Sequence, residues 1–188
     1  MSILAQIPPL SSLMTPANIV GAVALSASFT WPLLRRRDAI LAVQIFGSLL
    51  FAAHYWLLGS PTAAAMCAFG IVQSVAVLLL ARRWQRVAAV GATVAVSLMV
   101  TVVTWTGLPS FFSQLGQMGG AVARLQPDVQ RLKLCFLVSA LFWCAHNLTV
   151  MSVFGLMSDA MALSGLTIGL WRMRKARVAG AGVPAPAR

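Results

Sequence analysis

The stretch "FAAHYWLLG", residues 51–59, places a histidine inside an almost wholly apolar sequence, and "WCAHNLTVM", residues 143–151, does so again. A polar ring in such surroundings needs either a hydrogen-bonding partner or a function. His54 and His146 are the two histidines of the chain, and they stand 92 residues apart. Their matching surroundings indicate that one structural unit occurs twice.

The whole chain shares this apolar character. Of its 188 residues, 60% are hydrophobic and only 9% are charged. A soluble domain usually carries about 25% charged residues, because its surface must meet water. The composition therefore predicts an integral membrane protein whose outer surface meets lipid.

Seven apolar runs approach the roughly 20 residues that a spanning helix needs. They cover residues 16–34, 38–58, 61–82, 86–107, 108–126, 131–151 and 153–173. The prediction is an all-α integral membrane protein with seven transmembrane helices. The run over 108–126 is the weakest, because it holds Gln114, Gln117 and the pair Gly119-Gly120, and it is either a buried helix or a broken one.

The basic residues give an orientation. All 14 Lys and Arg residues fall on one side when the seven runs thread the membrane in turn, within residues 35–37, 82–86, 124–133 and 172–188. Since Lys and Arg concentrate on the cytoplasmic side of membrane proteins, we expect the N-terminus outside and the C-terminus in the cytoplasm. Residues 1–15 then form an extracytoplasmic segment, and residues 176–188 form a disordered cytoplasmic tail.

The net charge of +11 does not indicate a nucleic-acid partner. Nucleic-acid-binding proteins gather basic residues on one face or stripe, whereas here they stand in short blocks between apolar runs. We expect no nucleic acid to bind. The blocks are expected to fix the topology and to contact anionic lipid headgroups.

The 92-residue offset continues beyond the histidines. It superposes the second and third runs on the sixth and seventh, and it aligns Arg82-Arg83 with Arg174-Lys175. Both copies run in the same direction, because a single helix separates them. We therefore expect two parallel three-helix repeats in a 3+1+3 arrangement, which is a known plan of transporters. The first repeat covers residues 16–82, the linker helix 86–107 and the second repeat 108–175.

The residues that carry these patterns also resemble a known family. "RRRDAILAVQIFGSLLFAAHYWLLGSPTAAAMCAFG" (35–70), preceded by "WPLL" and echoed by "FWCAHN" (142–147), is similar to the bacterial YgjV-type inner membrane proteins. The resemblance implies a location in the bacterial inner membrane. Through its three-helix repeat, the chain is also similar to the SWEET and PQ-loop superfamily of small-solute transporters.

The chain departs from that superfamily at its functional motifs. PQ-loop proteins carry Pro-Gln in the first helix of each repeat, whereas this chain has Pro32-Leu33 and, at the matching position, Arg124-Leu125. SWEET sugar sites use asparagines on the third helix of each repeat. The corresponding helices here offer Met66, Cys67, Gln73, Ser158 and Asp159. The resemblance therefore implies a solute transporter without implying that the solute is a sugar.

The two histidines allow two interpretations. In the first they are interfacial, and each imidazole reaches lipid headgroups or a neighbouring carbonyl. In the second they form a pair that faces a central cavity and binds solute or exchanges protons near neutral pH. Their occurrence at matching positions makes the second interpretation as strong as the first.

Four further residues complete the candidate site. Asp159 is the only acidic residue outside the cytoplasmic breaks, and it is either a favourable charge near a helix N-terminus or a cation or proton site. The offset pairs it with Cys67, so a site built here is asymmetric. Asn147 lies at a similar depth, where hydrogen bonding between helices is the usual role. Trp56 fits either the aromatic belt of the interface or a stacking role.

The expected function follows from these features. We expect a transporter that moves a small polar solute across a bacterial inner membrane by alternating access between the two repeats. The expected substrate-binding residues are His54, His146, Asn147, Asp159, Trp56 and Cys67. The alternative is a membrane binding or regulatory protein that uses the same bundle without transport. The expected partners are the solute and membrane lipids. The sequence does not decide whether the chain also forms a homo-oligomer.

No enzymatic activity, metal ion or cofactor is expected. Ser164 stands about two turns deeper than His146, so this pair does not provide an adjacent nucleophile and base. The sequence holds no phosphate-binding loop, no HExxH motif and no cluster of metal-ligating residues.

Overall fold

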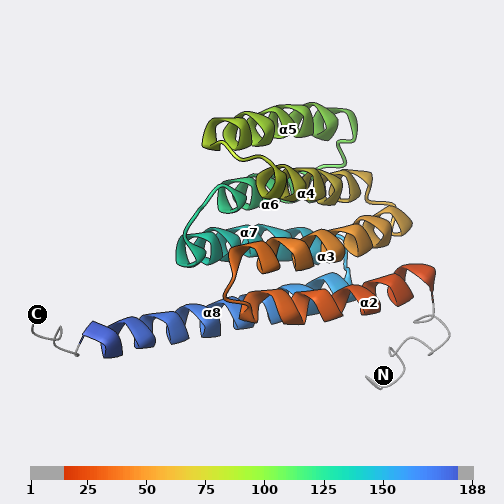
Figure 1. Cartoon of the computed structure of the whole chain (residues 1–188). Coiled ribbons are helices and arrows are strands. Elements are labelled where there is room, and N and C mark those ends of the chain that lie inside the picture. Colours follow the sequence, from red (N-terminus) through yellow and green to blue (C-terminus); the bar gives the residue numbers. More distant parts are fainter. Residues whose placement is uncertain (1–14, 182–188) are drawn as a thin grey trace, which may run out of the picture.

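The computed structural model describes residues 15–181, and within this range the chain is all helical (Figure 1). The elements are α2 (Pro16–Thr30), the 3-10 helix η2 (Trp31–Leu33), α3 (Arg37–Leu57), α4 (Pro61–Leu79), α5 (Arg83–Val103), α6 (Leu108–Arg124), α7 (Val129–Thr149) and α8 (Val153–Ala181). The all-α prediction is confirmed. Residues 1–14 and 182–188 lie outside the described range, and α8 continues past residue 176, where the sequence predicts a disordered tail.

Five of these helices are long and apolar enough to cross a membrane, namely α3, α4, α5, α7 and α8. The other two are shorter than the roughly 20 residues that a span requires, with 15 residues in α2 and 17 in α6. α2 ends early because Pro32, in η2, lacks the N–H that an α-helix would need. α6 stops just before Pro127, and it is an unbroken helix with one buried polar face. The seven predicted spans are thus five full spans and two shorter helices.

The helices stack in two rows (Figure 1). α2, α3 and α4 form one row, and α8, α7 and α6 form the other, so that α2 packs on α8 and α4 packs on α6. α5 lies outside both rows against α4 and α6. It is also the least buried of the long helices, which suits a helix that faces lipid along much of its length.

The helix boundaries of the two rows keep a constant offset. α6 begins 92 residues after α2 (108 against 16), α7 begins 92 after α3 (129 against 37), and α8 begins 92 after α4 (153 against 61). The turns also match, since Gly59 after α3 and Met151 after α7 both adopt a positive φ, of 71° and 52°. The same local backbone is therefore built twice from different side chains.

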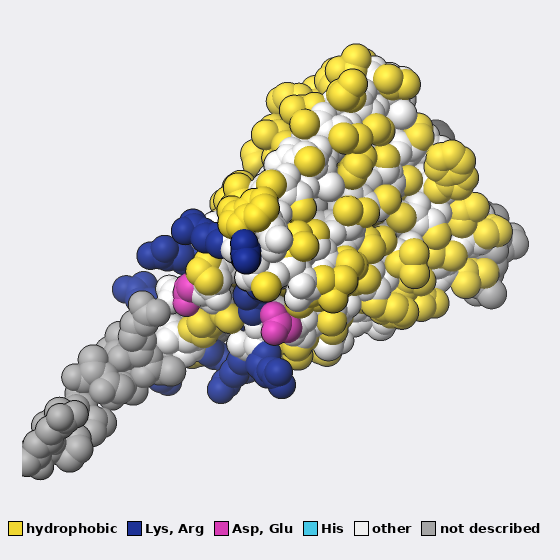
Figure 2. Space-filling model, turned by 45° about the horizontal axis from the view of Figure 1, so that its top comes forward, with side chains coloured by type: hydrophobic (Ala, Val, Ile, Leu, Met, Phe, Trp, Pro, Cys, Tyr) yellow, Lys and Arg dark blue, Asp and Glu magenta, His cyan; other side chains and the backbone are white. Residues whose placement is uncertain are grey.

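The surface divides into a broad apolar belt and one basic end. Hydrophobic side chains cover most of the visible face, and the Lys and Arg side chains gather at one end of the molecule (Figure 2). We call this the basic end, and it is formed by residues 35–37, 82–86, 124–133 and 172–175. The turns after α3 and α7, which follow the two histidines, lie at the opposite end. An apolar belt with one charged end is the surface expected of a protein embedded in a bilayer.

Candidate solute site

A cavity of about 140 Å³ lies between the two rows of helices. Every element except α5 contributes to its lining, so both halves of the chain line the cavity. Small residues leave this space open, among them Ala27, Gly47, Gly70, Gly116 and Gly120. A side chain at Gly116, for example, would collide with the indole of Trp143.

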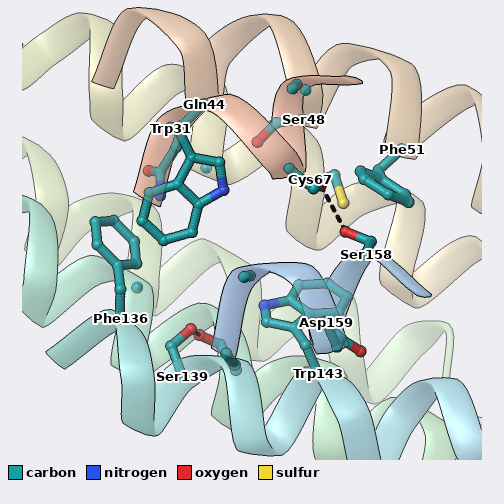
Figure 3. Close-up of a pocket in the computed structure, with 18 of the residues that line it drawn as sticks. Trp31, Gln44, Ser48, Phe51, Cys67, Phe136, Ser139, Trp143, Ser158 and Asp159 are labelled. Atoms are coloured by element: carbon teal, nitrogen blue, oxygen red, sulfur yellow. Dashed lines mark hydrogen bonds between the residues drawn. The ribbon is translucent and has the colours of Figure 1, made fainter. Parts of the chain in front are cut away.

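Aromatic rings form much of the cavity wall. Tyr55 stacks against Trp143 with ring centroids 5.8 Å apart and an interplanar angle of 15°, and it also stacks on Phe51. Trp31 meets Phe136 edge to face at 5.4 Å. Trp31 and Phe136 lie toward one end of the cavity, and Trp143 and Phe51 lie toward the other (Figure 3).

The end of the cavity nearer Trp143 carries a carboxylate. Asp159, on α8, is only 7% exposed, and its Oδ2 accepts a hydrogen bond of 2.7 Å from Nδ2 of Asn147. The Oδ1 of Asn147 in turn accepts a bond of 2.9 Å from the hydroxyl of Tyr55. This chain of hydrogen bonds joins α3, α7 and α8. Within residues 15–175, no hydrogen bond reaches Oδ1 of Asp159, and the carboxylate has no Lys, Arg or His within 4.0 Å.

The other end carries a guanidinium. Arg124, the last residue of α6, is 6% exposed. Its Nε donates to the Ser74 hydroxyl at 2.9 Å and its Nη1 donates to Oε1 of Gln73 at 3.3 Å, while its Cζ lies 5.6 Å from the Phe136 ring centroid. Among the described residues, no carboxylate pairs with this cation and no acceptor bonds its Nη2.

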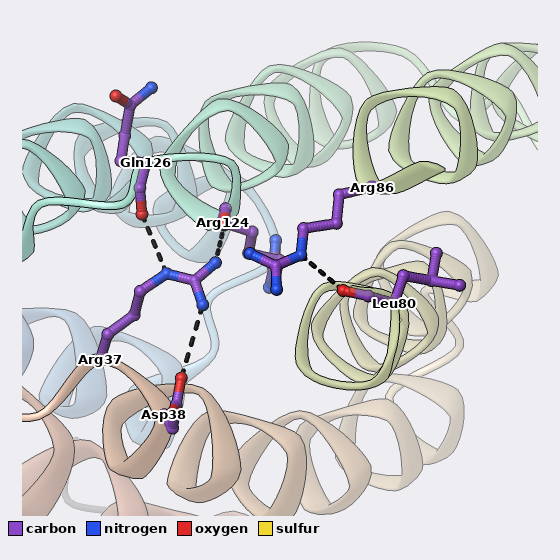
Figure 4. A network of polar contacts seen from close by, with 6 residues as sticks. All are labelled: Arg37, Asp38, Leu80, Arg86, Arg124 and Gln126. Carbon is purple, nitrogen blue, oxygen red and sulfur yellow. Dashed lines mark hydrogen bonds and ion pairs between the residues drawn. The ribbon is translucent and has the colours of Figure 1, made fainter. Parts of the chain in front are cut away.

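Arg124 is held in place from the basic end of the bundle. Arg37, on α3, donates from Nη2 to the carbonyl oxygen of Arg124 at 2.8 Å and from Nε to that of Gln126 at 3.0 Å (Figure 4). Arg37 also forms the ion pair with Asp38, at 3.5 Å. These contacts fix the last turn of α6, because the final carbonyls of a helix have no partner within the helix.

Two glutamines that line the cavity have buried side-chain atoms without partners in the described part of the chain. They are Oε1 of Gln44 and Nε2 of Gln117, whose residue is 2% exposed, and both side chains line the cavity. An unsatisfied buried polar group costs roughly 1–3 kcal/mol, and native proteins rarely leave one without a partner. These atoms therefore call for a polar partner that the described residues do not supply.

The structure places both histidines close to the cavity but outside its lining. Nδ1 of His54 lies 2.7 Å from the carbonyl oxygen of Ala17, and Nδ1 of His146 lies 2.8 Å from that of Pro109. A carbonyl oxygen only accepts, so each ring donates from Nδ1 and fastens its helix to the first turn of the preceding one. Both rings are buried, so neither faces lipid, and contact with the solute stays a prediction for both.

The other predicted residues divide into two groups. Asp159 and Cys67 line the cavity, and Asn147 positions Asp159 from behind. Trp56 is 69% exposed and points away from the site, as an aromatic belt residue does. Its neighbour Tyr55, in contrast, lines the cavity.

Sequence reasoning missed the contribution of Arg124 to the site. The sequence pattern placed Arg124 in the basic block 124–133, whose expected role is to fix the orientation of the helices in the membrane. Its position gave no distinct signal, because Arg124 stands two residues inside the end of run 108–126, just as Lys133 stands two residues inside the start of run 131–151.

These features define an α-helical membrane protein with several spanning helices and a cavity, lined by both halves of the chain, that holds a carboxylate and a guanidinium. A family model described as bacterial inner membrane protein, Imp-YgjV, matches residues 15–177. The chain belongs to this family, and the bacterial inner membrane is its location. Comparison with curated proteins and with solved structures gives no significant match.

Proposed function

We propose that this protein carries a small polar solute across the bacterial inner membrane, with the cavity as its binding site. The observation that supports this most is the cavity itself, which holds Asp159, Arg124 and Gln117 inside a bundle whose outer surface is apolar. Charged groups in the interior of a membrane protein are costly, and they typically mark solute or ion pathways.

Alternating access is supported by the construction of the two rows. We treat α2–α4 and α6–α8 as two parallel copies around the linker α5, because their boundaries keep the 92-residue offset. The packing of α2 on α8 matches that of α6 on α4, as a two-fold axis along the membrane normal requires. In this plan the site lies at the interface of the copies, and rocking of one copy against the other opens it to each side in turn. The same features favour the relation to SWEET and PQ-loop transporters.

The basic end is proposed to face the cytoplasm. The described Lys and Arg residues lie at that end, and Lys and Arg favour the cytoplasmic side. This orientation puts the N-terminus outside and the C-terminus inside, and it brings the basic residues to anionic lipid headgroups.

The alternative function is a binding or regulatory protein that does not move its ligand. Hydrogen bonds that join the two rows favour it, because transport must break some of them. At the end opposite the basic one, His54 bonds Ser152 at 3.0 Å. At the basic end, Lys133 donates to the carbonyl oxygen of Pro32 at 2.8 Å.

Counterflow in proteoliposomes tests the proposal, with sugars, amino acids and small organic acids as solutes. The variant Ser48→Trp places an indole in the cavity, which Ser48 lines, and is expected to abolish counterflow. Its matched control is Leu49→Trp, since Leu49 is the next residue of α3 and its side chain is exposed. The control should keep the wild-type rate. Flux that survives Ser48→Trp, or a folded wild-type protein that moves none of the solutes, would contradict the proposal.

A further inference from the structure

The cavity holds a carboxylate and a guanidinium that do not pair with each other. Asp159 and Arg124 are both more than nine-tenths buried, and the ion pair found among the described residues is Arg37–Asp38. A buried charge without a counter-charge is strongly unfavourable, so each of these groups calls for an opposite charge in the cavity. We propose, building on the proposed function, that the solute is a small zwitterion that carries an ammonium group and a carboxylate group.

Each charged group has free hydrogen-bonding capacity on the side of the cavity. Oδ2 of Asp159 is occupied by Asn147, whereas no donor among the described residues reaches Oδ1. Nε and Nη1 of Arg124 bond Ser74 and Gln73, whereas Nη2 bonds no described acceptor. An ammonium therefore binds at Asp159 and a carboxylate binds at Arg124, where a guanidinium offers a planar pair of donors.

The neighbouring side chains suit the same orientation. Nε2 of Gln117 is a donor without a described partner, and it can bond a solute carboxylate. At the other end, Trp143 lines the cavity near Asp159 (Figure 3), with Tyr55 stacked on one face of its indole. Aromatic rings attract ammonium groups by cation–π interaction. The two ends of the cavity thus select opposite charges with independent groups.

The separation of the two ends fits a short molecule. Arg124 overlies Phe136, and Trp143 marks the end near Asp159. Phe136 and Trp143, both on α7, are seven positions apart, which corresponds to a helix rise of about 10 Å. Two charge-assisted hydrogen bonds of about 2.8 Å each leave about 5 Å for the solute itself. This length accommodates an ammonium and a carboxylate separated by one to three carbon atoms.

The size of the cavity sets the same limit. Its volume of about 140 Å³ is close to that of an engineered cavity of about 150 Å³ that binds benzene. The cavity as it stands therefore holds a molecule of about six non-hydrogen atoms. A disaccharide or a nucleotide is too large, and a neutral polyol of suitable size would leave both buried charges without a partner.

The experiment compares five probes with six non-hydrogen atoms each. Alanine and β-alanine are zwitterions, lactate keeps only the carboxylate, alaninamide keeps only the ammonium, and lactamide is neutral. Competition against tritiated alanine is measured on the purified full-length protein in detergent at about pH 6.5, where α-amino groups are protonated. We expect one of the zwitterions to bind about 10- to 100-fold more tightly than the three other probes, the factor typical of losing a hydrogen bond to a charged group.

Two variants test which residue binds which charge of the solute. Each variant should keep one of the two preferences, and the preference that it keeps shows that the variant is folded. Asp159→Asn should remove the preference for alanine over lactate and keep the preference over alaninamide. Arg124→Gln should do the reverse, because it deletes the partner of the carboxylate. Equal binding of all five probes to the wild-type protein, no binding of either zwitterion, or variants that leave both preferences intact would overturn the zwitterion proposal.

Counterflow of the same probes separates this proposal from the proposed function. If a zwitterion binds selectively but does not cross proteoliposome membranes, transport is wrong and the ligand class is right. If sugars or organic acids cross while alanine and β-alanine neither bind nor cross, the ligand class is wrong and transport is right.

Discussion

The two halves of this bundle have matching helix boundaries but divide the chemistry unequally. α2–α4 and α6–α8 begin at positions 92 residues apart, and in both halves a histidine bonds a carbonyl oxygen 37 residues earlier in the chain. At matching positions, however, Cys67 stands opposite Asp159 and Pro32 stands opposite Arg124. Both charges of the site therefore come from the second half. The comparison teaches that both halves line the cavity, whereas the residues that differ between the halves supply its charges.

The largest expected effect comes from replacing Asp159, a carboxylate that only the second half has at this position, with the matching residue of the first half. Asp159→Cys gives the second half the residue of the first, and it should lower zwitterion affinity about 10- to 100-fold, because the ammonium loses its charged partner. The exchange Cys67→Asp with Asp159→Cys moves the carboxylate to the other side of the cavity. If the halves are equivalent in space, the exchanged protein should recover part of the binding in the tritiated alanine assay. An exchanged protein that folds but binds no better than Asp159→Cys would show that the halves are not equivalent there.

The next comparison concerns the space behind the site. Gly155 has no room for a side chain, because a Cβ atom would collide with the amide of Asn147. The matching residue of α4, Ala63, carries a buried methyl group. Gly155→Ala should lower the free energy of unfolding by about 1–3 kcal/mol through overpacking, and it should weaken zwitterion binding, because Asn147 can no longer hold Asp159.

Ala63→Gly is the matched control for that prediction. It should cost about 1–2 kcal/mol, from helix propensity and from the loss of a buried methyl group, and it should leave zwitterion affinity unchanged. Reversible unfolding in mixed detergent micelles measures both variants. If Gly155→Ala proves as stable as the wild-type protein and binds as well, Asn147 has another way to reach Asp159.

Much of this fold could be predicted from the sequence, because its physical signals are local. Apolar runs located every helix, and two histidines in similar surroundings supplied the 92-residue offset that the helix boundaries also keep. The lengths of α2 and α6 could not be read in this way. Hydropathy reports which residues tolerate lipid, whereas the ends of these helices depend on Pro32 and Pro127.

The site was harder to predict, because facing directions depend on tertiary packing. Asp159 and Asn147 were found because they are unusual in an apolar run, and Cys67 was found because the offset pairs it with Asp159. All three lie in or beside the cavity. Trp56 and Tyr55 are adjacent, so their side chains point about 100° apart on a helix. Only the packing of α3 decides which of the two enters the site, and the sequence contained no information that favours Tyr55.

A smaller effect separates the two turns that follow the histidines. Ser152 accepts a hydrogen bond of 3.1 Å from the N–H of Gly155 at the start of α8, and it also bonds His54 at 3.0 Å. The matching Ser60 caps α4 without a side-chain hydrogen bond. Ser152→Ala should therefore lower the free energy of unfolding by about 1–2 kcal/mol, and Ser60→Ala should change it by less than about 0.5 kcal/mol. Equal losses in the two variants would mean that the turns are equivalent in energy as well as in backbone.

The smallest effect concerns the left-handed residue of each turn. Met151 adopts a φ of 52°, and the matching residue of the first half is Gly59, with a φ of 71°. Among residues 15–181, Met151 is the only residue other than glycine that has a positive φ. A side chain in this left-handed conformation costs roughly 1–2 kcal/mol. Glycine adopts the conformation without that strain, but it increases the conformational entropy of the unfolded chain, which offsets part of the gain. Because Met151 is exposed, its replacement removes little packing. Met151→Gly should thus raise the free energy of unfolding by about 0.5–1 kcal/mol, and Gly59→Met should lower it by a similar amount. If Met151→Gly instead destabilises the protein, the methionine side chain contributes a contact, with lipid or with a second copy of the chain, that outweighs the strain of its backbone.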